Sequence, residues 1–211
     1  SLDHEESLGI IGPNGCGKTT LLHTIAGLHD NYSGLLRIDT TEEKIALILQ
    51  DIGLLPWKTI WKNATLGLDL GLKGNEESVK DLLYELDLYS YRNSFPSQLS
   101  GGQKRKLGLA RALAVDPKIL LMDEPFVSLD EFTREKLQNK VLKLWQERNL
   151  TMILVTHDIE EVAFLGENIA VLSRPPASVR SYINNEKMGT MEFRRSEDFY
   201  KVVKKIRDEL Q

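Results

Sequence analysis

The chain has 211 residues, 41% of them hydrophobic and 27% charged, which suits one sizeable soluble domain. Its formal net charge of −4 and its pI of about 5.7 exclude the basic excess typical of nucleic-acid-binding proteins. The single cysteine, Cys16, excludes an intrachain disulfide. No apolar run approaches the roughly 18 residues of a membrane span, so any task at a membrane requires a partner protein.

The first elements alternate between strand and helix. Residues 7–11 are short and apolar and predict a buried strand. Residues 18–26 have helical spacing, and Gly27 fits a helix C-cap. Residues 35–39 and 44–49 predict two further strands.

The stretch from about residue 54 to residue 116 has no convincing strand. Helices are predicted at residues 60–70 and 76–86. A third helix begins with Ser100 as its N-cap and runs to about Val115. We therefore expect a helical insert between two strands of a sheet.

The second half of the chain returns to alternating strands and helices. Strands are predicted at residues 118–122, 152–156 and 169–173, and helices at residues 130–148, directly after His157, and at residues 196–210. Strands that alternate with helices form a mostly parallel sheet with helices on both faces. The expected fold class is therefore α/β.

Residues 12–19 match the phosphate-binding loop pattern G-x-x-x-x-G-K-[ST] between a predicted strand and a predicted helix. Glycines let successive backbone N–H groups turn toward phosphate oxygens, and the following helix N-terminus adds positive charge. We expect Lys18 to reach the β- and γ-phosphates and Thr19 to bind Mg²⁺. The predicted ATP-binding residues are Gly12, Pro13, Asn14, Gly15, Cys16, Gly17, Lys18, Thr19 and Thr20. Alone, this loop leaves kinase, GTPase and ATPase functions open, and a glycine-rich turn with a chance lysine is the alternative.

Two adjacent acids end the aliphatic strand predicted before Pro125. A buried strand delivers its last residues to the carboxyl edge of the sheet, where nucleotides bind. Asp123 is expected to hold Mg²⁺ through water, and Glu124 to polarise the attacking water as a general base. The alternative is a solvent-facing strand end, which the aliphatic run disfavours.

Residues 99–103, with the sequence LSGGQ, begin a helix with an unusual first turn. Ser100 is a good N-cap, whereas two glycines weaken a helix and expose backbone N–H groups that can bind an anion. A second anion site in a chain with one phosphate-binding loop suggests that two chains share ATP.

Here the chain resembles the ABC transporter ATPases, whose LSGGQ signature it carries without a substitution. The motif order also matches along nearly the whole chain. It runs through Walker A at residues 12–19, the Q-loop Gln50, the signature at residues 99–103, Walker B at residues 119–123, Glu124, a D-loop at residues 128–130 and the switch His157. The resemblance implies one P-loop NTPase domain over residues 1–211, with a helical insert at about residues 54–116 and a reduced N-terminal β part.

The resemblance also implies a head-to-tail homodimer in the ATP-bound state. ATP would lie between Walker A of one subunit and the signature of the other, through Ser100, Gly101, Gly102 and Gln103. Gln50 would contact Mg²⁺ or the lytic water, His157 would bind the γ-phosphate, and Asp130 would bridge the subunits. The implied metal residues are Thr19, Gln50 and, through water, Asp123. Outside this series, a lone histidine after a strand is more often a helix cap or a core residue.

Three stretches resemble the ATPases of nitrate, sulfonate and taurine importers. They are the LLPW of residues 54–57, the DEPF and LD of residues 123–130, and THDIEE at residues 156–161 with VLS at residues 171–173. Importers of thiamine-precursor pyrimidines use similar ATPases. The implied function is hydrolysis of Mg-ATP to power uptake of a small solute through transmembrane permease subunits. The alternatives are an exporter ATPase and a soluble ABC ATPase acting on nucleic acid or ribosomes.

Such an importer ATPase binds the cytoplasmic face of a bacterial or archaeal membrane. A substrate-binding protein takes part only indirectly, and nucleic acid is not a partner. Trp57 and Trp61 either pack in the core of the insert or belong to a surface that receives the permease, since tryptophan is enriched in binding hot spots.

The start of the chain departs from the family pattern. Family members carry an upstream aromatic residue that stacks on adenine, whereas no residue before Gly12 is aromatic and His4 is the nearest candidate. The resemblance therefore implies either a missing start or a different hold on adenine. Residues 39–43 also look shorter than the usual turn.

Overall fold

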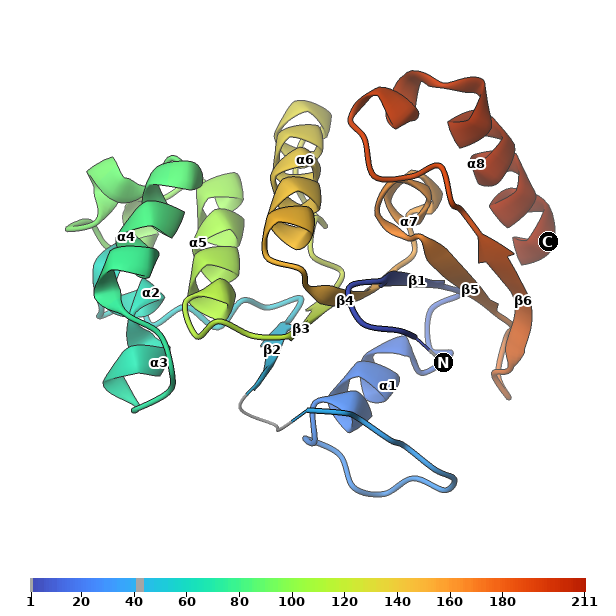
Figure 1. Cartoon of the computed structure of the whole chain (residues 1–211), viewed down its shortest axis with the longest axis horizontal. Helices are drawn as coiled ribbons and strands as arrows, with labels where there is room; N and C mark the ends of the chain where they lie inside the picture. The colour runs from blue at the N-terminus through green and yellow to red at the C-terminus, as the bar shows by residue number, and fades with distance from the viewer. Residues whose placement is uncertain (1, 41–43) are drawn as a thin grey trace.

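Strands and helices alternate along the chain, as the sequence predicted. The computed structural model describes residues 2–40 and 44–211. Its strands are β1 (Ser7–Ile11), β2 (Ile45–Ile48), β3 (Ile119–Asp123), β4 (Thr151–Thr156), β5 (Asn168–Leu172) and β6 (Val179–Asn184). In the described part of the chain these strands form one sheet in the order β2-β3-β4-β1-β5-β6 (Figure 1).

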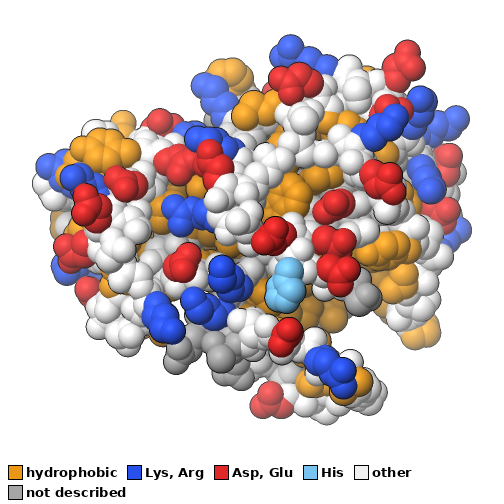
Figure 2. Space-filling model, viewed as in Figure 1, with side chains coloured by type: hydrophobic (Ala, Val, Ile, Leu, Met, Phe, Trp, Pro, Cys, Tyr) orange, Lys and Arg blue, Asp and Glu red, His pale blue; other side chains and the backbone are white. Residues whose placement is uncertain are grey.

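Helices flank this sheet. The α-helices are α1 (Lys18–Ile25), α2 (Ile60–Ala64), α3 (Leu66–Asp69), α4 (Glu76–Glu85), α5 (Gly101–Leu113), α6 (Glu131–Glu147), α7 (Ile159–Leu165) and α8 (Glu197–Leu210). Short 3₁₀ helices are η2 (Tyr89–Tyr91), η3 (Pro96–Gln98) and η4 (Glu192–Arg195). None of the helices in the described residues is both long and apolar enough to cross a membrane. On the face drawn in Figure 2, acidic and basic side chains are interspersed.

The sheet is parallel from β2 to β5, and only β6 runs antiparallel, at the edge beside β5. Strand β4 lies between β3 and β1, with Asp123 opposite Val155 and Ile11 opposite Thr156. The carboxyl ends of these three strands therefore meet at one edge. Ligands of open α/β sheets bind outside this edge.

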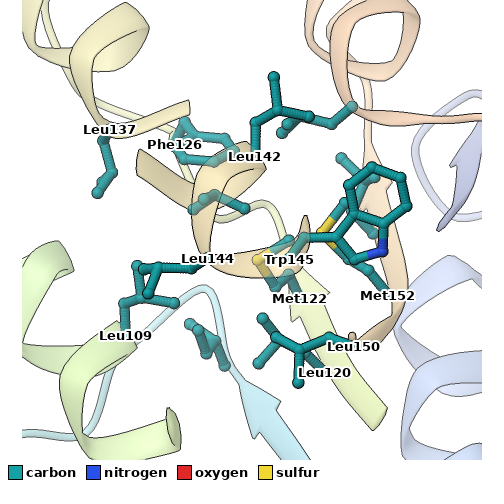
Figure 3. Close-up of a cluster of buried hydrophobic side chains, with 14 of the residues drawn as sticks. Leu109, Leu120, Met122, Phe126, Leu137, Leu142, Leu144, Trp145, Leu150 and Met152 are labelled. Atoms are coloured by element: carbon teal, nitrogen blue, oxygen red, sulfur yellow. The ribbon is translucent and has the colours of Figure 1, made fainter. Parts of the chain in front are cut away.

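The central strands are buried on both faces, so their side chains alternate between two cores. Met122 and Met152 contribute to the larger core, where Trp145 of α6 lies beside them (Figure 3). Leu121 contributes to the smaller core on the opposite face, together with Leu22 of α1. Coverage of both faces explains why these strands read as continuous aliphatic runs.

The segment between β2 and β3 contains helices, and its residues, all of them described, include no strand. The fully buried side chain of Asn63 makes hydrogen bonds to the first loop of this segment. The amide Nδ2 donates to the carbonyls of Leu55, Lys58 and Thr59 at 3.0 Å, and Oδ1 accepts from the N–H of Leu55 at 2.8 Å. The helical character of the insert is confirmed, while its division from the rest as a subdomain stays a prediction.

The predicted strand at residues 35–39 is wrong. This segment has no regular secondary structure, and Leu35 is 85% exposed. A strand must bond its backbone N–H and C=O groups to a neighbour, and among the described residues no strand lies beside this one. Residues 41–43, part of the turn for which a shortened length was predicted, lie outside the described residues.

Three other details differ from the sequence prediction. The helix predicted at residues 60–70 is two helices, α2 and α3, which meet at the buried Thr65. Strand β6 and the short helix η4 were both missed. Most of β6 is exposed, with Ile183 as its buried residue, so the strand lacks the alternating pattern that marks a half-buried strand.

Candidate nucleotide-binding site

The phosphate-binding loop follows β1 directly and ends where α1 begins. Gly17 is the N-cap of α1 with φ 94°, a left-handed conformation that glycine adopts without strain. The Lys18 side chain turns back into the loop, where its Nζ donates to the carbonyls of Gly12 at 2.8 Å and Pro13 at 3.1 Å. Lys18 is only 7% exposed. The loop thus holds one ammonium group, while the exposed Thr19 and Thr20 stand at the start of the helix.

The acid pair lies at the same edge of the sheet. Asp123 ends β3 and is buried. Glu124 follows with φ 47°, an uncommon conformation for a residue with a side chain, and its N–H donates to the carbonyl of Val155 at 2.9 Å. That bond anchors the turn to β4. It therefore fixes the backbone position from which the Glu124 side chain projects.

His157 follows β4 and meets Glu124. Its Nδ1 lies 2.9 Å from Glu124 Oε1, and the histidine side chain is 59% exposed. The Thr156 hydroxyl donates a long bond of 3.5 Å to Glu124 Oε2. Neither alternative for His157, a helix cap or a core residue, fits this exposed side chain, because the cap of α7 is Asp158.

The oxygen groups at this edge suit a hard cation. The Thr19 hydroxyl and the Asp123 carboxylate are of the kind that Mg²⁺ prefers, and Mg²⁺ usually completes its shell with water and substrate phosphates. Among the described residues, no three His, Cys, Asp or Glu side chains gather into a complete metal cage. A Mg²⁺ ion at this edge would therefore take most of its oxygen ligands from water and phosphate.

The signature residues form a tight helix start. Ser100 is the N-cap of α5, and its Oγ accepts from the N–H of Gln103 at 3.3 Å. The Gln103 side chain returns the bond, because its Oε1 accepts from the N–H of Ser100 at 2.9 Å. Gly102 packs so closely that an added Cβ would lie 2.5 Å from the Thr133 side chain, whereas Gly101 faces open space. Gly101 and Ser100 are therefore the accessible part of this turn.

Some of the predicted site residues line two separate cavities. One, of about 640 Å³, is lined by Gly12, Asn14 and His157. The other, of about 460 Å³, is lined by Gln50 and Gly101 among others. The structure thus joins the phosphate-binding loop to His157, and joins Gln50 to the signature, but it separates these two groups. Helices α1 and α5, which follow the phosphate-binding loop and the signature turn, cover opposite faces of the sheet (Figure 1).

Asp130 has a structural task within its own chain. It is the N-cap of α6, and its Oδ1 accepts from the N–H of Thr133 at 3.0 Å. Hydrogen bonds from Thr133 hold the pKa of Asp130 below its ordinary value. The helix predicted to start at residue 130 thus begins one residue later. A second oxygen of the exposed carboxylate can still face a partner.

Sequence reasoning assigned no role to Thr156, Asp158 or Arg134, although all three contact the site. Asp158 caps α7 by accepting from the N–H groups of Glu160 at 2.9 Å and Glu161 at 3.2 Å. An aspartate between a strand and a helix is an N-cap signal, so the sequence could have revealed this residue. The contacts of Arg134 join distant segments and leave no local pattern.

Glu161 is a buried carboxyl in the first turn of α7. It is 4% exposed, and within the described residues its Oε1 has no hydrogen-bond partner. Burial raises the pKa of Glu161 well above its ordinary value, and the nearby charges of Asp158 and Glu124 raise it further. The folded protein therefore holds this proton to a higher pH than the unfolded chain does.

We expect Glu161→Gln to gain stability relative to the wild type as pH rises. A carboxyl whose folded pKa is raised contributes stability that is fully present below its unfolded pKa of about 4.3 and is lost as pH rises through the folded value. The neutral amide has no such dependence. Urea unfolding of both proteins at several pH values from about 4 to 8 measures the difference in the free energy of unfolding.

Glu160→Gln is the matched control, because Glu160 is an exposed carboxylate on the same turn. Its difference from the wild type should stay small across the range. A Glu161→Gln difference that does not change with pH contradicts the raised pKa.

A phosphate-binding loop, an acid pair and the His157 side chain meet at the carboxyl edge of a mostly parallel sheet. Together these features define a P-loop ATPase. The ABC transporter family profile matches residues 1–127. The chain therefore belongs to the ABC transporter family, as the motif order predicted, and it is a nucleotide-binding ATPase.

Relatives and solved structures agree with this assignment. The chain is 38% identical to an aliphatic sulfonates import ATP-binding protein SsuB of Bacillus cereus, over 97% of this chain and 83% of the relative. It is 41% identical to a taurine import ATP-binding protein TauB of Shigella sonnei, over 85% of this chain and 73% of the relative. The dimeric ATP-binding cassette MJ0796 bound to ADP and phosphate superposes with a TM-score of 0.77 at 30% identity, covering 89% of each chain.

Proposed function

We propose that two copies of this chain hydrolyse Mg-ATP between them to power an importer for a small anionic solute such as a sulfonate. The separation of the phosphate-binding loop from the signature turn supports this assignment most directly: Gly12 and Asn14 line one cavity, and Gly101 lines another. A phosphate-binding loop and a signature turn that lie apart in one chain can meet when a second copy binds head to tail. The dimeric form of the related cassette MJ0796 supports the same arrangement.

Each site residue then has a task in the shared site. Lys18 exchanges the carbonyls of Gly12 and Pro13 for the β- and γ-phosphates. Glu124 accepts a proton from the attacking water, and His157, held against it at 2.9 Å, orients that water at the γ-phosphate. Lys18 and the helix N-terminus balance the phosphate charge as it develops.

The second chain supplies the other half of the site. Ser100 and Gly101 offer a hydroxyl and exposed N–H groups at the start of α5, with Gly102 and Gln103 shaping the turn. Asp130 stands at the start of α6, where its exposed carboxylate faces the partner. Gln50, two residues after β2, lines the cavity beside Gly101 and would link the shared site to the helical insert.

Thr19 and Asp123 would hold Mg²⁺, the latter through water, and Gln50 would approach it once the site closes. Bound there, the cation would neutralise charge on the β- and γ-phosphates. The fit rests on the oxygen character of these side chains.

The membrane partner would dock on the helical insert. Trp57 is 71% exposed, and Leu70 is 73% exposed on the same insert, whereas Trp61 packs against the core. Tryptophan is enriched in binding hot spots, and an exposed one is a candidate contact for a partner. We therefore assign Trp57 to a surface for transmembrane permease subunits, which places the chain on the cytoplasmic face of a bacterial or archaeal membrane.

The names of the relatives favour import of a sulfonate-like solute over export. The solute itself would reach the permease through a substrate-binding protein and would not touch this chain. The soluble alternative, action on nucleic acid or ribosomes, finds no support in the interspersed charges of Figure 2 or in the net charge of −4.

Mixing two inactive variants tests the shared site. Lys18→Ala disables the phosphate-binding loop, and Ser100→Asp keeps an N-cap residue while placing a carboxylate where phosphate would bind. Each variant alone should be inactive. Random pairing makes about half of the dimers mixed, each with one intact site, so up to about a quarter of the wild-type ATPase rate should return.

The control is a mixture of Lys18→Ala with Glu124→Gln, in which both changes lie in the same half of the site. In the proposed site, the phosphate-binding loop and the base come from the same chain. No chain in this mixture has both of them unaltered, so the mixture should stay inactive. Wild-type activity combined with no recovery in the Lys18→Ala and Ser100→Asp mixture would show that one chain holds a complete site and would overturn the proposal.

A further inference from the structure

Arg134 connects two segments that are far apart in the sequence. It lies in the first turn of α6, and its guanidinium is about one-third exposed. Nη2 donates to the carbonyl of Leu129 at 3.1 Å, and Nη1 donates to Asp158 Oδ2 at 3.4 Å. One side chain thus bonds the turn at residues 128–130 and the residue that follows His157.

The first of these segments is a constrained turn. Ser128 has φ 64°, a left-handed conformation that costs free energy for a residue with a side chain. Leu129 is 7% exposed, and Asp130 is bound to the N–H of Thr133. The bond from Arg134 therefore further constrains this turn. It gives the Leu129 carbonyl a charged hydrogen-bond donor.

The second segment carries the switch histidine. Asp158 uses Oδ1 to cap α7, so Oδ2 is free to accept from Arg134. The N–H of Asp158 donates to the Thr156 hydroxyl at 3.0 Å, and that hydroxyl reaches Glu124. Between them, His157 contacts Glu124 at 2.9 Å. Arg134 therefore bonds to the residue that directly follows His157.

We infer that Arg134 is a positioning residue for hydrolysis, which holds His157 and Glu124 in register with the turn at residues 128–130. The inference rests on the proposed two-chain site, in which that turn lies at the partner. A partner that moves the turn would pull on Leu129, and the guanidinium would carry the displacement to Asp158. ATP binding itself does not involve this contact, because Arg134 lies outside the phosphate-binding loop.

The geometry requires an arginine. A guanidinium presents several N–H groups in a rigid fork and can bond two acceptors at once, whereas the lysine ammonium is a point charge on a flexible stem. A second arginine near Asp158, Arg194, does not duplicate the contact. It stacks on the Phe164 ring at 3.8 Å and donates to Gln138 at 2.7 Å, and neither of those residues belongs to the turn.

The test compares Arg134→Gln and Arg134→Lys with the wild-type chain. The maximal ATPase rate should fall about tenfold in both variants, while the KM for ATP and the affinity for a fluorescent ATP analogue stay within about twofold. Lysine should fail to rescue, because it restores the charge without the fork. Lys136→Gln is the matched control, since it removes an exposed cation two residues further along α6 and should keep the wild-type rate.

A double-mutant cycle with Asp158→Asn tests whether Arg134 acts through its bond to Asp158. Asparagine keeps an oxygen for the α7 cap and loses the charge that faces Arg134. The rate of Arg134→Gln/Asp158→Asn should be no lower than that of the slower single variant, whereas independent roles would multiply.

Several results would overturn the inference. They are a wild-type rate in Arg134→Gln, full rescue by Arg134→Lys, multiplied losses in the double variant, or a parallel loss of ATP affinity and thermal stability. If the wild-type chain itself neither binds nor hydrolyses ATP, the proposed function fails first, so the two failures are distinguishable.

Discussion

Glu124→Gln is expected to hydrolyse ATP about 10²–10⁴-fold more slowly than the wild-type chain, because an amide cannot accept the proton of the attacking water. Glutamine has nearly the same shape, so the turn after β3 and its bond to the Val155 carbonyl should persist. ATP would then remain bound between two chains. Single-turnover hydrolysis measures the rate, and light scattering with and without Mg-ATP measures the shift from monomer to dimer.

The control for this experiment is Glu131→Gln, which removes an exposed carboxylate at the start of α6. It should leave the hydrolysis rate near that of the wild type. Dimer formation by Glu124→Gln with ATP supports the shared site together with the role of Glu124. If ATP binds and hydrolysis is lost without a dimer, closure depends on the membrane partner. Wild-type hydrolysis by Glu124→Gln would remove Glu124 from the mechanism.

Lys18→Ala is expected to lose ATP hydrolysis by on the order of 100-fold or more, since it removes the one ammonium group held inside the phosphate-binding loop. The affinity for ATP should fall as well, because the same group is expected to contact phosphate in the ground state. Titration with a fluorescent ATP analogue and steady-state ATPase assays measure the two effects. Thermal unfolding checks the fold, because the carbonyls of Gly12 and Pro13 lose their donor.

Lys118→Ala serves as the comparison for Lys18→Ala. Lys118 is exposed just before β3, at the opposite end of that strand from Asp123. Its removal should change neither affinity nor rate. Unchanged ATP binding by Lys18→Ala, with a native unfolding temperature, would contradict the assignment of the loop at residues 12–19.

Local sequence signals predicted the elements that carry the chemistry. The strand at residues 7–11 and the helix that follows Gly17 appear where the pattern places them. Ser100 caps α5 as its type and position predicted, and Gly27 adopts the left-handed conformation of a helix end. Caps and phosphate-binding loops are encoded within a few adjacent residues, so they can be read without knowing the rest of the fold.

Prediction failed where a segment depends on distant neighbours. Residues 35–39 have strand-forming side chains, yet the described structure provides no partner strand for them. No element was predicted for residues 179–184, which nevertheless pair with β5 because the chain turns back after Pro176. Edge strands are selected by the available backbone partner more than by their own composition.

The sequence by itself determined the chemistry of this protein: the residue types and the order of Gly12–Thr19, Ser100–Gln103, Asp123–Glu124 and His157 identify an ABC transporter ATPase. Tertiary structure alone decided how these residues are grouped. The register of β1, β3 and β4 brings Glu124 within 2.9 Å of His157, and the opposite-face placement of α1 and α5 keeps the signature apart from the loop. It also joined Arg134 to Leu129 and Asp158. Contacts between segments tens of residues apart follow from strand order and packing, which no short stretch of sequence encodes.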